Sequence, residues 1–176
     1  MNSHKEYLNL IRSKLKTTDE ILHIKSELHS TGKRMAFTNG CFDILHRGHV
    51  EYLAKTAEMA DYMVIGLNSD ASVKRQNKSP ERPINDEHTR CFNLSALFFV
   101  DAVVLFEEDS PYEIIKTIIP DILIKGSDYD ASETNPNSRK YIVGSDVVRK
   151  AGGIVSTIPL VEGYSTTRLI EKIKRH

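Results

Sequence analysis

The chain has 176 residues, of which 40% are hydrophobic and 27% charged, and its 24 Lys and Arg residues balance 24 Asp and Glu residues. This length fits one domain with a sizeable core, and the zero formal net charge argues against a protein that holds nucleic acid by bulk electrostatics, while it leaves room for a local cationic pocket. No apolar run is long enough to span a bilayer, and the charged residues 1–16 lack the apolar core of a signal peptide, so we expect a cytoplasmic protein.

The predicted elements begin with two helices within residues 3–31. Apolar residues recur at helical spacing at Leu8, Ile11 and Leu15, and the pattern repeats at positions 21, 24 and 28. The "TTD" at 17–19 offers an N-cap for the second helix, and Gly32 offers a C-cap. We interpret residues 1–32 as an N-terminal helical extension and residues 33–176 as the domain that follows it.

After this extension, strands and helices alternate. Short apolar segments predict strands over 34–39, 62–68, 101–106, 121–126 and 153–160. Helical patterns predict helices over 50–59, 86–99, 111–119, 138–151 and 166–174. Short strands that are apolar on both faces and separated by helices are typical of a parallel sheet covered on both sides. The predicted fold class is therefore α/β, a doubly wound five-stranded parallel sheet with helices on both faces.

Two polar loops, 76–88 and 126–139, follow predicted strands. The carboxyl ends of parallel strands share one edge of the sheet, and such sheets bind their ligands at that edge. Both loops are therefore expected to border the binding site.

The stretch "FTNGCFDILHRGHVEYL" at 37–53 carries two histidines where a predicted strand leads into a helix. A helix N-terminus offers unpaired N–H groups and partial positive charge, so it favours anions. Gly40 and Gly48 allow a ligand to approach the backbone, and His46 and His49 would donate hydrogen bonds to phosphate oxygens. The histidines could instead be plain capping or surface residues. A zinc site is disfavoured, because no third His or Cys falls at ligand spacing.

The surrounding letters strengthen the anion-site interpretation. "GCFDILHRGH", with "TNGCFD" overlapping its start and "NSDASVKR" after the next strand, resembles the His-x-Gly-His signature of the nucleotidyltransferase superfamily, in its cytidylyltransferase-like branch. The resemblance implies a Rossmann-like fold in which this motif binds a nucleoside triphosphate. It also implies that the two histidines stabilise the transition state of transfer at the α-phosphorus.

Further segments resemble the same superfamily. "EGYSTTRLI" at 162–170 is similar to its C-terminal Ser-Thr-Thr motif, which opens the last helix and can cap it as well as bind phosphate. Arg90 matches the arginine of the helix after the second strand, and Lys74 and Lys78 lie where phosphate-binding lysines are placed. The resemblance thus implies His46, His49, Lys74 and Arg90 as catalytic residues. It implies these nucleotide-binding residues: Thr38, Asn39, Gly40, Cys41, Phe42, Gly48, Asn68, Lys78, Ser165, Thr166 and Thr167.

The chemistry of nucleotidyl transfer suits this set of residues. A phosphate oxygen attacks the α-phosphorus and pyrophosphate leaves. The nucleophile is already an anion at neutral pH, so no strong general base is required. Cationic and N–H donors, with Mg²⁺ on the triphosphate, meet the needs of charge and positioning. We see no carboxylate pair dedicated to a metal, so we expect the Mg²⁺ to arrive bound to ATP or CTP.

Within the superfamily, the chain is most similar to the adenylyltransferases that make ADP-heptose for bacterial lipopolysaccharide. The matching segments include "GLNSDASVKR", "RPIN", "PDILIKGSDY" and "VEGYSTT", over roughly residues 34–172. This resemblance implies transfer of AMP from ATP to heptose 1-phosphate, with a separate sugar kinase upstream. We also expect a homodimer, with no nucleic-acid or membrane partner. The implied substrate-binding residues are Asp43, Lys125, Gly126, Asp128 and Tyr129.

Several alternatives remain open. Glycerol-3-phosphate cytidylyltransferases are similar in the first and last motifs, but they have an arginine where this chain has Leu160, and their loop after the fourth strand differs. FAD synthetases and pantetheine-phosphate adenylyltransferases share the first motif, but the latter usually end in a different serine motif from "STTRLI". An NAD-dependent oxidoreductase should show G-x-G-x-x-G after the first strand, which is absent. A non-catalytic nucleotide-binding protein would be expected to have lost a histidine or basic residue, and none is lost.

Overall fold

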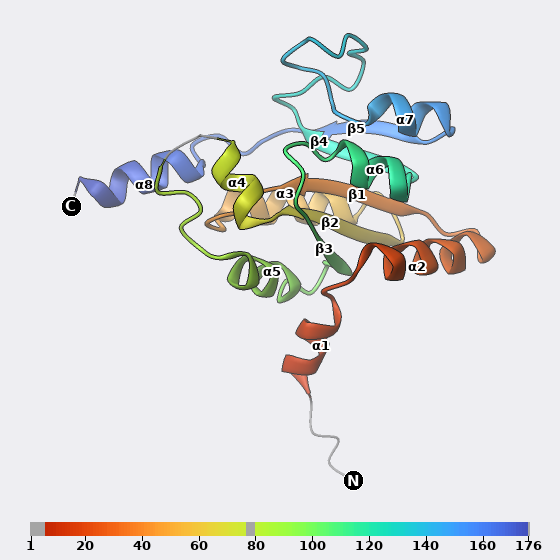
Figure 1. The fold of residues 1–176 in the computed structure, drawn as a ribbon, viewed down its shortest axis with the longest axis horizontal. Helices are drawn as coiled ribbons and strands as arrows, with labels where there is room; N and C mark the ends of the chain where they lie inside the picture. The colour runs from red at the N-terminus through yellow and green to blue at the C-terminus, as the bar shows by residue number, and fades with distance from the viewer. Residues whose placement is uncertain (1–5, 77–79, 176) are drawn as a thin grey trace.

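The computed structural model describes residues 6–76 and 80–175. Its centre is a sheet of parallel strands in the order β3-β2-β1-β4-β5, which Figure 1 shows from bottom to top. The strands are β1 (Met35–Gly40), β2 (Tyr62–Asn68), β3 (Ala102–Phe106), β4 (Ile122–Gly126) and β5 (Ile154–Ile158). The predicted doubly wound, five-stranded parallel sheet is therefore confirmed.

The strands are apolar on both faces because both faces are covered. In β1, Ala36 packs into the core on one side of the sheet, whereas Met35 and Phe37 pack on the other. This alternation follows from the two-residue period of a strand. Gly66 of β2 lies opposite Asn39 of β1 in the parallel register, and a Cβ there would come within 2.5 Å of the Phe37 ring. The glycine thus lets the two central strands pack closely.

The helices divide between the two faces. Side chains of α3 and α5 contribute to one core cluster, and those of α2, α6 and α7 contribute to the other. No helix of the described residues is long and apolar enough to cross a membrane. The helices are α1 (Tyr7–Ser13), α2 (Thr18–Ser30), α3 (Arg47–Ala57), α4 (Asp70–Arg75), α5 (Glu87–Ser95), α6 (Tyr112–Ile118), α7 (Ser145–Lys150) and α8 (Thr166–Lys174).

Three helix predictions need correction, and one helix was missed. The helix predicted over 86–99 ends at Ser95, because residues 96–99 form turns. The helix predicted over 138–151 is wrong in its first half, because the chain there forms turns and α7 begins only after Gly144, whose φ is +82°. Ile142 is buried in the core within those turns. The helix predicted over 50–59 begins earlier, at Arg47, with His46 as its N-cap. The short helix α4 was not expected, although Ser69 caps it by accepting a hydrogen bond from the N–H of Ser72.

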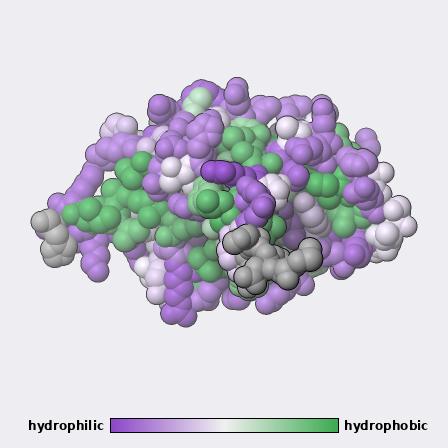
Figure 2. All heavy atoms as spheres, turned by 90° about the horizontal axis from the view of Figure 1, so that it is seen from below, coloured by the Kyte–Doolittle hydropathy of each residue, from purple (hydrophilic) through white to green (hydrophobic). Residues whose placement is uncertain are grey.

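The segment between the two N-terminal helices covers the outer edge of the sheet, whereas α2 packs on one of its faces. Thr17 is the N-cap of α2, as the "TTD" predicted, and it forms a capping box with Glu20. Residues 14–16 pair with the edge strand β3, since the N–H of Lys16 donates to the carbonyl of Val103 at 2.9 Å. Helix α1 packs against α5 and extends away from the layers in Figure 1. Two of its leucines, Leu8 and Leu10, stay exposed, and apolar atoms reach the surface in several areas of the face seen in Figure 2.

The order of the strands creates one switch point. From β1 the chain moves outward through β2 to β3, and it then returns to the other side of β1 to form β4 and β5. The crevice between the carboxyl ends of β1 and β4 is where a doubly wound sheet binds its ligand. Asn39 of β1 and Lys125 of β4 lie at this point, and α8 reaches outward beyond the sheet (Figure 1).

Candidate active site

A cavity of about 520 Å³ opens at this carboxyl edge. Five segments that are distant in sequence line it: the turn after β1, the first half of α3, the loop before α5 that carries Arg82, the end of β4 with the loop after it, and residues 160–167, which lead into α8. We call it the histidine cavity. Of the predicted site residues, it brings together Asn39, Gly40, Cys41, Phe42, His46, Gly48, His49, Lys125, Gly126, Asp128, Tyr129, Ser165, Thr166 and Thr167.

The two imidazoles stack on each other at the start of α3. Their ring centroids are 3.7 Å apart and the planes differ by 13°. His46 is the N-cap of α3, and its Nδ1 accepts a hydrogen bond from the backbone N–H of His49 at 3.2 Å. An accepting nitrogen carries no proton, so the neutral ring of His46 has its proton on Nε2. The cap therefore fixes the tautomer and leaves Nε2–H as the donor for a ligand.

His49 is poised differently. Its Nδ1 is buried and has no hydrogen-bond partner among the described residues. Burial, together with the neighbouring His46 and Arg82, lowers the pKa of His49 to about 4. Burial also lowers the pKa of His46. Both rings are therefore neutral at physiological pH, and an anion bound beside them would raise their pKa values.

Close packing holds the imidazoles in place. A Cβ at Gly48 would lie 3.0 Å from Cβ of Tyr164 and 3.2 Å from Nδ1 of His46, so a larger residue would force the two helix starts apart. The ring of Phe42 meets that of His49 edge-on, with centroids 5.3 Å apart. Phe42 has a φ of +44°, a conformation that costs about 1–3 kcal/mol in a residue other than glycine. The turn after β1 thus accepts strain to place this ring.

A second helix N-terminus faces the same cavity. Ser165 is the N-cap of α8, and its Oγ accepts the backbone N–H of Arg168 at 3.1 Å. The residue is thus a helix cap, as the sequence allowed, and its hydroxyl can still donate to a ligand. Tyr164 lies between the two helices, with its ring centroid 6.1 Å from that of His46. The N-termini of α3 and α8 together give the cavity a partial positive potential.

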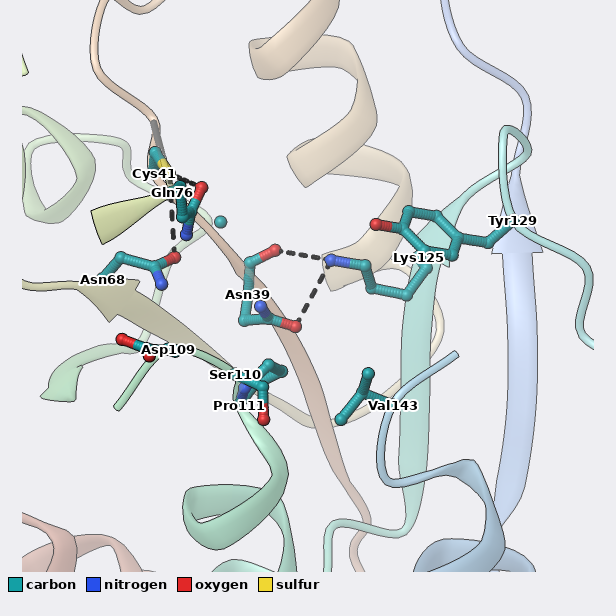
Figure 3. A pocket seen from close by; sticks show the side chains of 11 residues that line it. Asn39, Cys41, Asn68, Gln76, Asp109, Ser110, Pro111, Lys125, Tyr129 and Val143 are labelled. Carbon is teal, nitrogen blue, oxygen red and sulfur yellow. Dashed lines mark hydrogen bonds between the residues drawn. The ribbon is translucent and has the colours of Figure 1, made fainter. Parts of the chain in front are cut away.

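Lys125 marks the boundary with a second cavity. Its Nζ donates to the carbonyl oxygen of Asn39 at 3.0 Å and to its side-chain oxygen at 3.3 Å, and it lies 5.2 Å from the centroid of the Tyr129 ring. Figure 3 shows the Lys125 side chain reaching Asn39, with the Tyr129 ring beside it. The second cavity, of about 430 Å³, shares Asn39, Gly40, Cys41, Lys125 and Tyr129 with the first. We call it the amide cavity, because Asn39, Asn68 and Gln76 contribute amide groups to it.

Arg90 is placed behind the site rather than in it. The residue is 1% exposed and is not among the described residues that line either cavity. Its guanidinium donates to the carbonyl of Cys41 at 2.7 Å, to that of Asn85 at 3.1 Å and to the carboxylate of Asp70 at 2.8 Å. We therefore revise its expected direct catalytic role to a positioning role, in which it holds the turn after β1.

Asp43 also acts from behind the cavity. Its buried carboxylate accepts hydrogen bonds from Nε of Arg82 at 3.0 Å and from the backbone N–H groups of Ile84 and Asn85. It thereby organises the loop before α5, and its expected contact with substrate is revised accordingly. Arg82, which this ion pair holds, lines the histidine cavity and was not singled out from the sequence. Arg82 is the first residue of the "RPIN" segment, so the resemblance carried a signal for it, but the direction of its side chain depends on Asp43, 39 residues away.

Other predicted residues are distributed around the site. The hydroxyl of Thr38 is buried and lies 2.7 Å from that of Tyr52, so it holds the Tyr52 side chain, which lines the histidine cavity. Asn68 lines the amide cavity and not the histidine cavity. Lys74 is exposed on α4 rather than in a loop, and it is not among the described lining residues. Lys78 lies outside the described residues. Tyr52, Leu160, Val161 and Tyr164 line the histidine cavity without having been predicted.

The donors of the histidine cavity are compatible with a nucleotide-borne Mg²⁺. Within the described parts of the chain, no group of three or more His, Cys, Asp or Glu side chains could hold a metal ion. Mg²⁺ usually keeps several waters and binds through substrate phosphates with one or two carboxylates. Asp128 is the one carboxylate among the described residues that line this cavity, and it would be the side chain for such an ion.

A doubly wound parallel sheet with paired imidazoles and two helix N-termini at its switch point defines a Rossmann-like nucleotide-binding protein. The family model described as cytidylyltransferase-like matches residues 37–172, and the chain belongs to this family. The matched region contains both the histidine motif and Ser165, two parts of the sequence that line the histidine cavity.

Curated relatives and solved structures agree with this family. The chain is 49% identical over 160 residues to the bifunctional protein HldE of a Nitratiruptor species, with 91% of this chain and 32% of that protein covered. It is 52% identical over 143 residues to the bifunctional protein HldE of Mesorhizobium japonicum, with 81% and 27% covered. The chain thus spans about a third of the length of these relatives.

Two solved structures share the fold. The lipopolysaccharide core biosynthesis protein from Thermoplasma volcanium GSS1 matches with a TM-score of 0.55 and 27% identity, over 76% of this chain and all of that one. Pantoate-beta-alanine ligase from Francisella tularensis matches with a TM-score of 0.56 over 92% of this chain and 78% of that one. At 11% identity, the second match shows the fold alone.

Proposed function

We propose that this chain transfers AMP from ATP to heptose 1-phosphate, releasing pyrophosphate and forming ADP-heptose. The observation that carries the proposal is the stacked pair of neutral imidazoles at the N-terminus of α3, which line one cavity together with the N-terminus of α8. The close similarity to the bifunctional HldE proteins, together with the "KGSDY" loop after β4, supports heptose 1-phosphate as the acceptor.

The reaction needs positioning and charge stabilisation more than acid–base chemistry. An oxygen of the sugar phosphate forms a bond to the α-phosphorus, and the bond from that phosphorus to the bridging oxygen of the β-phosphate breaks. The electron pair leaves with pyrophosphate. Nε2–H of His46 and the backbone N–H groups at the starts of α3 and α8 donate to the phosphate oxygens where negative charge develops. Their fixed geometry spares the reorganisation that water would require.

His49 adds a donor that depends on the ligand. The free protein holds this ring neutral, with a pKa of about 4. A triphosphate beside it raises that pKa, because the anion favours the charged imidazolium. The uptake of a proton would then place a positive charge against the leaving group. Arg82 lines the same cavity and is held there by its ion pair with Asp43, so its positive charge lies beside His49.

The magnesium ion and the partners complete the proposal. When bound, Mg²⁺ would neutralise charge on the triphosphate, with Asp128 as the lining carboxylate. Lys74 and Lys78, from the segment after β2, are proposed to meet the phosphates when the nucleotide is bound. We also propose that the chain works in the cytoplasm as a homodimer, on a sugar 1-phosphate made by a separate kinase activity. Analytical ultracentrifugation tests the dimer directly.

The test of the function is pyrophosphate release with Mg²⁺. ATP and CTP are each offered with heptose 1-phosphate or glycerol 3-phosphate, and a His46→Asn variant serves as the control for contaminating activity. Release with ATP and heptose 1-phosphate alone is expected. Release with CTP and glycerol 3-phosphate would replace the proposal with a glycerol-3-phosphate cytidylyltransferase. Leu160, which lines the cavity where that family has an arginine, disfavours this outcome.

A further inference from the structure

The amide cavity differs in chemistry from the histidine cavity beside it. Its lining includes the side-chain amides of Asn39, Asn68 and Gln76, with Ser110 at its rim. Figure 3 shows Gln76, Asn68 and Cys41 gathered on one side of the opening and Lys125 on the other. Amide and hydroxyl groups both donate and accept hydrogen bonds, as sugar hydroxyls do. This side of the site is therefore suited to a neutral, polyhydroxylated group.

Internal hydrogen bonds orient these amides. Oε1 of Gln76 accepts from the thiol of Cys41 at 3.3 Å, so the amide nitrogen at the other end of the group is a donor for a ligand. Nδ2 of Asn68 donates to the hydroxyl of Ser72 at 3.0 Å, which fixes its side-chain oxygen as an acceptor. This oxygen lies 3.9 Å from Sγ of Cys41, whose single proton is closer to Gln76, so the oxygen can still accept from a ligand. The cavity thus presents a donor and an acceptor on rigid supports, which is the arrangement that discriminates between hydroxyl patterns.

The position of the two cavities assigns their ligands. The paired imidazoles, Arg82 and the start of α8 all lie on the histidine side, so the triphosphate belongs there. The nucleophilic phosphate must reach the α-phosphorus from outside the triphosphate. The two cavities meet at Lys125 and Asn39, where a cation borders both. A sugar phosphate with its phosphate at this junction extends its ring into the amide cavity.

We propose that the amide cavity binds the sugar part of the acceptor, with Gln76 and Asn68 reading its hydroxyls and Lys125 bound to its phosphate. This assignment rests on the proposed function and adds Gln76 to the site, and it moves Asn68 from the nucleotide to the acceptor. The volume of about 430 Å³ lies within the range of about 300–1,000 Å³ that is typical of small-molecule sites.

The experiment measures binding of each substrate separately in Gln76→Ala and in the isosteric Gln76→Met. Heptose 1-phosphate is titrated by calorimetry in the presence of saturating α,β-methylene ATP, whose α–β bridge cannot be cleaved, and this ATP analogue is also titrated alone. We expect both variants to bind the sugar phosphate about tenfold more weakly, because one oriented hydrogen bond is lost. Binding of the ATP analogue should stay unchanged. Asn93 is an exposed amide on α5 and is not among the described residues that line the cavity, so Asn93→Ala should match the wild type in both titrations.

The outcomes separate this proposal from the proposed function. Weaker binding of the ATP analogue with unchanged sugar phosphate binding would assign the amide cavity to the nucleotide and overturn the inference. Wild-type protein that does not bind heptose 1-phosphate at all would also overturn it. If the sugar phosphate binds and Gln76 variants lose it, but no pyrophosphate is released, the cavity assignment stands and the transfer reaction fails. The Met variant distinguishes lost hydrogen bonding from lost packing.

Discussion

The histidine cavity differs from the hydrogen-bond network behind it, which is formed around Arg90 and Asp43. Both contain charged and polar side chains, but those of the network are paired within the protein. In this network, the guanidinium of Arg90 donates three hydrogen bonds and the carboxylate of Asp43 accepts three, all with other groups of the protein. In the cavity, His49 keeps a buried nitrogen without a partner among the described residues. The polar groups of the network therefore stabilise the fold, whereas those of the cavity are left available to a ligand.

The difference teaches where substitutions should act. Removing one partner of a buried ion pair leaves the other charge buried, which costs stability. Removing a donor that waits for a ligand costs catalysis, because the folded protein never used it. Both regions contain residues that match family motifs, so a motif alone does not say which kind of loss to expect. The following predictions test the division, beginning with the largest expected effect.

Arg90→Ala should lower the free energy of unfolding by about 3–5 kcal/mol. The substitution empties the space of a fully buried side chain and leaves the carbonyls of Cys41 and Asn85, with the half-buried carboxylate of Asp70, without their donor. Urea denaturation measures the loss. Lys116→Ala, which breaks an exposed pair with Glu113, is the matched control and should cost about 0–1 kcal/mol. A stable Arg90→Ala protein with lost turnover would return Arg90 to the group that contacts substrate.

His46→Asn and His49→Asn should each lower turnover about 10²–10³-fold, the usual loss for one oxyanion donor. Asparagine is a good N-cap, so the first variant keeps the start of α3 and isolates the catalytic loss. Steady-state pyrophosphate release gives kcat and KM, and denaturation confirms folding. His23→Asn, on the exposed face of α2, is the control and should be fully active. Near-normal turnover in either cavity variant would remove the histidines from the mechanism.

The sequence predicts those elements whose structure is determined by residues close together in the chain. The strand over 62–68 and the helix over 166–174 match the structure, since their own patterning and caps define them. The two motifs around His46 and Ser165 could be brought together because parallel strands share a carboxyl edge. The burial of Arg90 and the placement of Arg82 depend on contacts across 49 and 39 residues, which no local pattern encodes. The turns before α7 likewise follow from Ile142 entering the core.

The neutral state of His49 should make the protein sensitive to acid. The folded pKa of about 4 lies below the ordinary histidine value of 6.5, so the unfolded chain takes up this proton first as the pH falls. The contribution is present above the unfolded pKa and is lost as the pH falls from about 6.5 toward 4. At about pH 5 the loss amounts to about 2 kcal/mol.

Urea unfolding at about pH 7 and about pH 5 measures this contribution. His49→Asn should lose about 2 kcal/mol less stability than the wild type between the two conditions, whereas the exposed His23→Asn should follow the wild type. Equal acid sensitivity in all three proteins would mean that His49 is not held neutral by its surroundings. A non-hydrolysable ATP analogue should reduce the effect, because bound phosphate favours the protonated ring.

Ser165 tests the boundary between the two kinds of residue, since it both caps α8 and lines the cavity. Ser165→Ala should cost about 1 kcal/mol of stability through the lost cap and lower turnover only several-fold, because the backbone donors of α8 remain. Ser165→Asn restores an accepting cap at Arg168 but not the hydroxyl. If Ser165→Asn restores both stability and turnover, Ser165 acts as a helix cap, with Arg90 and Asp43 among the residues that stabilise the fold. If Asn restores stability while turnover stays low, the hydroxyl itself touches the phosphate, and a single side chain serves the fold and the ligand together.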